Sequence, residues 1–290
     1  MRQILTLIAD RSSTTLTAAM IGRVREAVGG GEATILSEGE AADIPLDHAP
    51  DPVLIQEALG NAAVDRIVTK ARGRRKGLLV ADMDSTIVTS ETLDELADYA
   101  GLKAEIEAIT RQSMNGEIDF AEALRQRVAM LRGLSLDALE KTWARTELMP
   151  GARELIATMR AHNALTALVS GGFTFFTGRV AEVVGFDRHH ANILMDDGQV
   201  LTGSVAEPIL DRDAKKATLL SLAAERGLQR SATMAVGDGA NDLAMLEAAG
   251  LGIAYHAKPI VAREAKARVD HGNLRALLFA QGYPAAAFVT

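Results

Sequence analysis

Three clusters of polar residues have the types and spacing that could carry out chemistry. They are Asp82 and Asp84, Ser170 and Gly171, and the segment 237–242, which reads Gly-Asp-Gly-Ala-Asn-Asp. Each cluster directly follows a short apolar run of the kind found in buried parallel strands. Because ligands bind at the carboxyl ends of the strands in open α/β sheets, we expect the three clusters to meet at one edge of a shared sheet.

These residue types favour phosphoryl transfer through a carboxylate nucleophile. An aspartate can form an acyl phosphate, which divides one difficult displacement into two easier ones. Because a phosphate dianion repels a carboxylate, a divalent cation and a positive side chain must neutralise both charges. Oxygen ligands select Mg²⁺, and Asp82 and Asp238 would supply them. Asp84 would act as general acid and then as general base, provided that a neighbouring carboxylate raises its proton affinity.

Each cluster also has a purely structural interpretation. Asp82 and Asp84 could form a turn after the strand. Ser170 with the two glycines after it could be a flexible strand-to-helix turn, and the segment 237–242 could be a turn that caps a helix. One cluster alone leaves both interpretations open, whereas the occurrence of all three in one chain favours catalysis.

The elements that would position these clusters belong to the second of two parts. Residues 1–74 contain strand-like and helical runs in the order βαββαβ, which suits a small ferredoxin-like α+β sandwich. Residues 75–290 alternate apolar strands with helices, which predicts an α/β domain with a parallel sheet. Its core would comprise residues 75–89 and 150–290. The helix-rich segment at about 90–149 would be an insertion that could fold over the site.

Two kinds of strand are expected within the α/β domain. Buried strands of the parallel sheet are predicted at Gly77–Ala81, Ala164–Val169, Thr233–Val236 and Gly252–Ala254. Residues Phe186–Val205 carry a hairpin signal instead, because Asp196-Asp-Gly198 separates two strand-like runs.

Composition excludes several classes of protein. The 290 residues include no Cys, so disulfides, zinc–thiolate sites and cysteine nucleophiles are impossible. The net charge of −7 argues against a nucleic-acid partner. No apolar run approaches the ~20 residues of a membrane-spanning helix. A cytoplasmic location is the simplest expectation, and the oligomeric state is open, with a homodimer as one alternative. The basic run Lys70–Lys76 is interpreted as a solvated linker or as a phosphate-binding patch.

With four motifs in order, the sequence resembles the haloacid-dehalogenase (HAD) superfamily of phosphatases, in which an aspartate is the nucleophile, and within it the branch that acts on phosphoserine. The motifs are Asp82-Met-Asp84-Ser-Thr86, Ser170-Gly171-Gly172-Phe173, a lysine within residues 211–216, and Gly237-Asp238-Gly-Ala-Asn241-Asp242. The lysine is Lys215 or Lys216, and the alignment of the motif favours Lys215. The resemblance covers residues 76–277, approximately. It implies a Rossmann-like parallel sheet with a helical cap inserted after the first strand.

The resemblance also implies the catalytic and metal-binding residues. Asp82 would be the nucleophile that becomes phosphorylated, and Asp84 would be the general acid and base. Mg²⁺ would be held by Asp82, by the backbone carbonyl of Asp84 and by Asp238. Asp242 would support the outer shell of the metal.

The substrate-binding residues implied by the resemblance fall into two groups. The first would bind or orient the phosphoryl group: Ser170, the amide of Gly171, Lys215 and Asn241. The second belongs to the cap: Glu91, Met114, Phe120 and Arg127. Glu91 would bind the ammonium group of the substrate and Arg127 its carboxylate. Met114 and Phe120 would exclude water from the closed site.

The implied reaction is Mg²⁺-dependent hydrolysis of O-phospho-L-serine to L-serine and phosphate, the last step of serine biosynthesis. Two alternatives keep the same site: transfer of the phosphoryl group to an alcohol, and hydrolysis of another small phosphomonoester. A third is a regulatory binding protein built on a phosphatase fold. Residues 1–74 resemble the small amino-acid-binding ACT modules, and this resemblance implies serine binding there.

Overall fold

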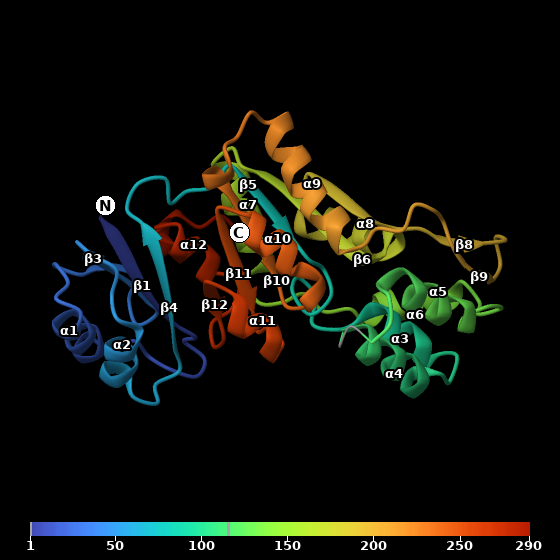
Figure 1. The fold of residues 1–290 in the computed structure, drawn as a ribbon, viewed down its shortest axis with the longest axis horizontal. Coiled ribbons are helices and arrows are strands. Elements are labelled where there is room, and N and C mark those ends of the chain that lie inside the picture. Colours follow the sequence, from blue (N-terminus) through green and yellow to red (C-terminus); the bar gives the residue numbers. More distant parts are fainter. Residues whose placement is uncertain (1, 115–116) are drawn as a thin grey trace.

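The N-terminal part is an antiparallel sheet with two helices packed on one face (Figure 1). The computed structural model describes residues 2–114 and 117–290, without the side chains of Met114 and Arg212. The elements of this part are β1 (Gln3–Ala9), α1 (Ala18–Ala27), β2 (Thr34–Ser37), β3 (Ala41–Leu46), α2 (Pro52–Leu59) and β4 (Val64–Lys70). The strand order β2-β3-β1-β4 is the ferredoxin-like arrangement expected from the βαββαβ pattern.

A six-stranded parallel sheet forms the centre of the second part, with the order β12-β11-β10-β5-β6-β7. Its strands are β5 (Leu78–Ala81), β6 (Leu165–Phe173), β7 (Arg188–Asn192), β10 (Thr233–Gly237), β11 (Leu251–Tyr255) and β12 (Ala267–Val269). The central strand β5 is fully buried, with Leu78 and Val80 in one apolar cluster and Leu79 and Ala81 in the other. This alternation follows from the period of two along a strand and leaves both faces to be covered by helices.

Helices cover both faces of this sheet and thereby explain its apolar strands. One face packs against α7 (Ala152–Ala161), α8 (Thr174–Val184) and α12 (Ala276–Ala280). The other packs against α9 (Arg212–Glu225), α10 (Leu243–Ala248) and α11 (Pro259–Glu264). The predicted α/β fold class is therefore confirmed.

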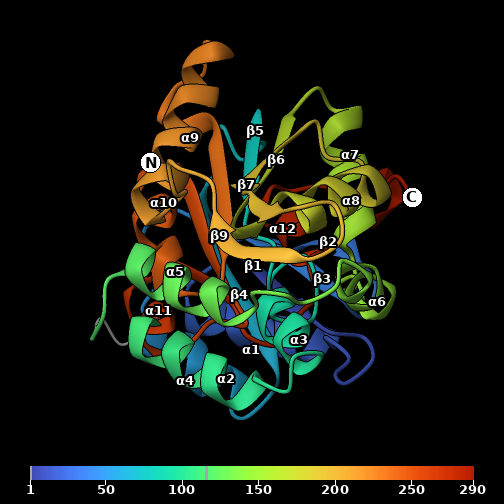
Figure 2. The same ribbon diagram turned by 90° about the vertical axis from the view of Figure 1, so that its right-hand side faces the viewer.

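Four helices between β5 and α7 form the cap: α3 (Thr92–Asp98), α4 (Lys103–Met114), α5 (Phe120–Met130) and α6 (Asp137–Arg145). A hairpin of β8 (Leu194–Asp196) and β9 (Leu201–Val205) packs beside them. Figure 2, viewed from this end, shows the cap helices and β9 in front of the sheet. Gly203 permits the close approach of β9 to α5, because a Cβ there would lie 2.8 Å from the Cβ of Arg132.

Two features of the parallel sheet differ from the expectation. The hairpin expected over Phe186–Val205 is confined to β8 and β9, and β7 is the parallel edge strand of the main sheet. Its Arg-His-His sequence lacks the apolar run of a central strand because it is partly exposed at the edge. Strand β6 also continues beyond Val169 to Phe173, with an irregular register between these residues. It therefore carries Ser170 and Gly171 within the strand and not after it.

The second face of the N-terminal sheet is buried against the second part. Ile8 of β1 and Ile67 of β4 belong to the same apolar cluster as the core of the parallel sheet. Polar contacts also cross this boundary, since the Asp65 carboxylate accepts backbone N–H bonds from residues 270–272. The N-terminal sheet is thus buried on both faces, although the predicted boundary at residue 74 stays a prediction.

Arg74, in the basic run Lys70–Lys76, ties the two parts together. Its Nη2 donates to Asp43 Oδ1 at 3.0 Å and to Thr6 Oγ1 at 2.9 Å. The same guanidinium donates to the carbonyls of Phe279 and Ala280. Arg74 is neither a solvated linker residue nor free to bind phosphate, because its guanidinium is largely buried and is paired with groups far away in the sequence.

Among the described residues, no helix combines the length and apolar character needed to cross a bilayer.

We expect Arg74→Met to lower the free energy of unfolding by about 3–5 kcal/mol, because it leaves a buried carboxylate without its cation. Arg2→Met is the matched control, since Arg2 pairs with Asp47 at the surface and should cost about 1 kcal/mol or less. The side chains of Arg2 and Asp47 are 78% and 75% exposed, against 12% and 10% for Arg74 and Asp43. Urea unfolding followed by circular dichroism measures both variants. Equal losses would contradict the structural role of Arg74.

Candidate active site

The three polar clusters lie together at the carboxyl edge of the parallel sheet. Strand β5 lies between β10 and β6, so its last residue, Ala81, is paired with Val236 on one side and Leu168 on the other. The next residue, Asp82, donates its backbone N–H to the Val236 carbonyl at 3.0 Å. Asp82 and Asp238 therefore follow two neighbouring strands, and Ser170 lies near the end of a third, β6.

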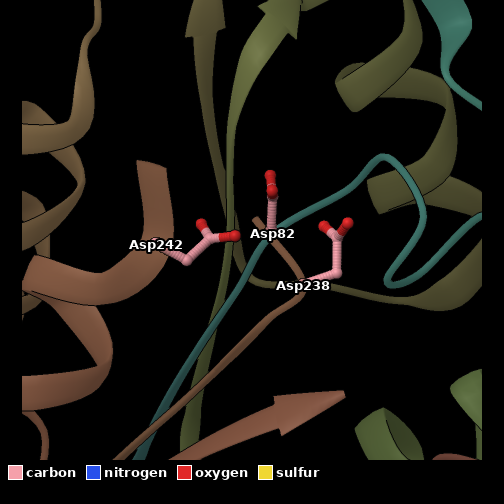
Figure 3. A group of neighbouring side chains, drawn as sticks. All are labelled: Asp82, Asp238 and Asp242. Carbon is pink, nitrogen blue, oxygen red and sulfur yellow. The ribbon is translucent and has the colours of Figure 1, made fainter. Parts of the chain in front are cut away.

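Three buried carboxylates form the centre of this edge (Figure 3). Oxygen atoms of Asp82, Asp238 and Asp242 all lie within 4.8 Å of one another. Figure 3 shows the Asp82 and Asp238 side chains pointing in the same direction, with Asp242 approaching from the side. Asp242 Oδ2 also accepts the Gly239 N–H at 3.0 Å. Gly237 allows this packing, because a Cβ there would lie 2.4 Å from the Asp242 Cγ.

Lys215 is the cation that joins two of these carboxylates. Its Nζ lies 2.8 Å from Asp82 Oδ1 and 2.7 Å from Asp242 Oδ1, and its side chain is 1% exposed. The lysine reaches them from the first turn of α9, where Asp211 accepts the Ala214 N–H as the N-cap. Lys216, the alternative, is exposed. Helical phase thus directs only one of the two lysines into the site.

The pKa shifts of the charged groups in this cluster are compatible with a bound divalent cation. Burial raises the pKa of Asp82 well above its ordinary value, Asp242 raises it further, and Lys215 opposes both. Burial alone would lower the pKa of Lys215, but Asp242 and Asp82 outweigh it and raise that pKa. Burial also raises the pKa of Asp238 to about 6. Mg²⁺ at Asp82 and Asp238 would place positive charge beside these carboxylates and favour their ionised forms.

The two oxygen atoms of Asp82 have different surroundings. Oδ1 accepts from Lys215 and from the Met83 N–H at 2.8 Å. Within residues 2–114 and 117–290, no hydrogen bond is made to Oδ2. One oxygen is therefore held in place while the other is available to a ligand.

Asp84 lies at the same edge with a pKa suited to proton transfer. Burial raises its pKa to about 7, with a further contribution from Glu91. Its Oδ1 accepts the Thr92 N–H at 2.9 Å, and its Oδ2 lies 3.3 Å from Ser170 Oγ. A group that titrates near neutral pH can serve both as general acid and as general base.

Ser170 and Gly171 lie between the carboxylates and the cap. Ser170 Oγ accepts the Gly172 N–H at 2.8 Å. A Cβ at Gly171 would lie 2.9 Å from the Phe120 ring, so only glycine leaves this approach of the cap open. The buried Asn192 holds the strand here, because its Nδ2 donates to the Gly171 carbonyl at 2.9 Å and its Oδ1 accepts the Leu210 N–H at 2.7 Å.

The cap brings a carboxylate and a guanidinium to the site. Glu91 is the N-cap residue of α3, but its side chain makes no capping bond and instead accepts from Ser85 Oγ at 2.9 Å. Arg127 is 8% exposed and donates from Nη1 to Thr110 Oγ1 at 3.1 Å. Burial lowers the pKa of Arg127, and Asp94 opposes this shift. Opposite charges thus stand on the cap side of the site.

A cavity of about 570 Å³ lies between the cap and the carboxylates. Its walls include the predicted residues Asp82, Asp84, Glu91, Phe120, Arg127, Ser170, Gly171, Asp238 and Asn241. Lys215 is buried against Asp82 and does not line it. The Met114 side chain lies outside the described residues. The predicted residues that line this cavity come from both the sheet edge and the cap.

Lys258 also lines the cavity and was not predicted from the sequence. Its Nζ lies 3.5 Å from Asp238 Oδ2 and 3.7 Å from Glu91 Oε1. It follows β11, one of the expected strands, so the rule that polar residues after parallel strands share one edge could have found it. Asn192 was missed as well, because its strand was interpreted as part of a hairpin.

The comparisons with known proteins agree with this geometry. The family model of the haloacid dehalogenase-like hydrolases matches residues 79–247. The phosphoserine phosphatase of Streptococcus thermophilus is 45% identical over 199 residues, which cover 69% of this chain and 93% of that protein. A solved phosphoserine phosphatase, an analogue of its phospho-aspartyl intermediate, is 39% identical with a TM-score of 0.67 and covers 71% of this chain and 98% of that one.

One solved structure matches almost the whole molecule. An HAD-family hydrolase from Salmonella enterica serovar Typhi has a TM-score of 0.86 at 29% identity, over 96% of this chain and 98% of that one. The N-terminal sheet and its placement against the second part therefore recur in another protein. Because the family model covers more than half of the 290 residues, this chain belongs to the haloacid dehalogenase-like hydrolase family.

Proposed function

We propose that this protein hydrolyses O-phospho-L-serine to L-serine and phosphate, with Mg²⁺ as cofactor and Asp82 as nucleophile. The observation that carries the proposal is Asp82 itself, which is buried, held at one oxygen by Lys215 and open at the other toward the cavity. The similarity to phosphoserine phosphatases, one of them solved as a phospho-aspartyl analogue, supports it.

The reaction follows from the positions of two carboxylates. Asp82 Oδ2 attacks phosphorus, the bond from phosphorus to the serine oxygen breaks, and Asp84 gives its proton to that oxygen. Asp84, now ionised, then takes a proton from a water molecule that attacks the phosphorus of the acyl phosphate. The bond between Asp82 and phosphorus breaks, which releases phosphate and restores both residues. Mg²⁺ held by Asp82 and Asp238 would offset the charge of the phosphoryl oxygens.

The remaining residues would bind the substrate at its two ends. Ser170, the Gly171 amide and Lys215 would donate to the phosphoryl oxygens, since Ser170 and Gly171 line the same cavity as Asp82 and Lys215 contacts Asp82 directly. Arg127 would bind the carboxylate of the amino acid as a fork, and Glu91 would bind the ammonium group in competition with Lys258. This pair of opposite charges favours a phosphorylated amino acid over a sugar phosphate. Serine binding by residues 1–74, a homodimer and a cytoplasmic location stay predictions.

Asp82→Asn should lower kcat by at least about 1,000-fold, because an amide is not a nucleophile toward phosphorus. Phosphate release from phosphoserine, phosphothreonine and glucose 6-phosphate, with Mg²⁺ and with EDTA, measures both the activity and its specificity. Asp98→Asn, on the exposed side of α3, is the control and should retain full activity. Turnover by Asp82→Asn at the rate of the control would rule out the assigned nucleophile.

Substitution of Lys215 and substitution of Lys216 should have very different effects on kcat/KM. Lys215→Met removes the cation beside Asp82 and should reduce kcat/KM at least about 100-fold. Lys216→Met, one residue along the same helix but exposed, should stay within about twofold of the unaltered protein. Steady-state phosphate release measures both, with circular dichroism to check folding. A larger loss in the Lys216 variant would reverse the assignment.

Substitutions of two arginines on α5 can distinguish recognition of the amino acid from the phosphoryl-transfer step. Arg127→Met should raise KM for phosphoserine at least about tenfold, since a charge-assisted hydrogen bond is lost. The same variant should hydrolyse p-nitrophenyl phosphate, which has no carboxylate, with nearly unchanged kcat/KM. Arg125→Met is the matched control, because Arg125 pairs with Glu207 at the surface. Equal losses on both substrates would argue against a contact between Arg127 and the carboxylate.

A further inference from the structure

The larger of two described cavities lies at the opposite edge of the parallel sheet from the active site. It measures about 1230 Å³ and lies between the segment 68–76 and the amino ends of β10, β11 and β12. The residues before β10 and at the start of β11 and β12, namely 230–232, 249–252 and 265–267, form one wall. We call this cavity the basic cleft.

Positive charge dominates the walls of the basic cleft. Seven of its lining residues are Lys or Arg, and two are Glu. Lys70, Arg72 and Lys266 are exposed, and within the described ranges none of the three forms an ion pair. The whole chain carries a net charge of −7, so this concentration of cations does not follow from its composition.

Lys76 lies in the wall of the cleft without an acidic partner among the described residues. Its Nζ donates to the carbonyls of Gly73 at 3.0 Å and Ser231 at 2.7 Å. Burial lowers the pKa of Lys76, and the neighbouring Lys70 lowers it further. A half-buried ammonium group beside another cation would be stabilised by an anion in the cleft.

Two uncharged polar side chains lie in the same wall of the cleft. Gln3 Oε1 and Thr69 Oγ1 are buried and have no hydrogen-bond partner among the described residues. Both residues line the basic cleft. Because these two atoms are closed to solvent, they belong to the packing behind the wall and not to the surface that an occupant would contact.

We propose that the basic cleft binds a small polyanion, a molecule with two or more phosphate or carboxylate groups, at a site separate from the active site. The volume is ample for a metabolite. The three unpaired cations and Lys76 would bind the anionic groups. The cleft contains parts of both domains, so its occupant would contact the segment that joins them.

The test is calorimetric titration of the full chain with two probes, inorganic pyrophosphate and tricarballylate, in 150 mM sodium chloride without metal. The variant K70Q/R72Q/K266Q should bind each probe at least tenfold more weakly. The matched control R11Q/R132Q/K141Q changes three exposed residues away from the cleft, with the same loss of charge, and should bind as the unaltered protein does. Pyrophosphate that binds in the active site contributes equally to all three proteins and cancels in the comparison.

The outcomes separate the sources of the anionic group. Binding of pyrophosphate alone would support a phosphate-bearing ligand, and binding of tricarballylate alone a carboxylate-bearing one. Equal affinity in the two triple variants, or no binding of either probe below 10 mM, would overturn the proposal. Circular dichroism checks that the variants are folded, and K266Q alone provides a second measurement, with an expected weakening of about threefold.

Discussion

The bridge from Lys215 to Asp82 and Asp242 is the interaction on which the site depends. Carboxylates buried at the end of a sheet would otherwise repel each other, and their charge would be lost by protonation. One ammonium group on a buried helix face opposes this loss of charge at Asp82 and holds both carboxylates at fixed positions. The constraint extends into the backbone, because Gly237 must lack a Cβ for Asp242 to approach. The positions of Asp82, Lys215 and the turn at Gly237 therefore depend on one another.

A second set of buried charges organises the boundary between the two parts of the chain. Glu40, Asp43 and Asp65 of the N-terminal sheet are all buried, and each is satisfied by groups from residues 72–290. Arg275 joins Glu40 to Glu154 of α7, so the contact extends to a helix of the catalytic core. Apolar residues such as Ile8 and Ile67 fill the space between them. The N-terminal sheet is thus an integral part of the folded molecule.

The strands that could be predicted from the sequence are those marked by a pattern of neighbouring residues. The buried strands β5, β6 and β10 were predicted because each is a short apolar run followed by polar residues. The choice of Lys215 over Lys216 came from the alignment of the family motif, and helical phase indicated only that one of the two points inward. Sequence reasoning failed for β7, whose polar sequence reflects its place at the sheet edge. Lys258 follows an expected strand and the strand-end rule could have found it, while Asn192 was missed because its strand was interpreted as part of a hairpin. Arg74 was missed because its partners lie far away in the chain. No window of neighbouring residues contains that information.

The two edges of the parallel sheet carry opposite charge, and this follows from how each is built. At the carboxyl edge, Asp82, Asp84, Asp238 and Asp242 gather around two lysines, so the edge needs further positive charge. At the amino edge, the basic run Lys70–Lys76 lies against the starts of β10 to β12, where Glu247 and Glu264 are the two carboxylates among the lining residues. Buried charges without partners are costly, as at the carboxyl edge, whereas the exposed cations of the amino edge stay hydrated and attract anions by their combined field. Mg²⁺ and phosphate would complete the first edge, and the proposed polyanion would complete the second.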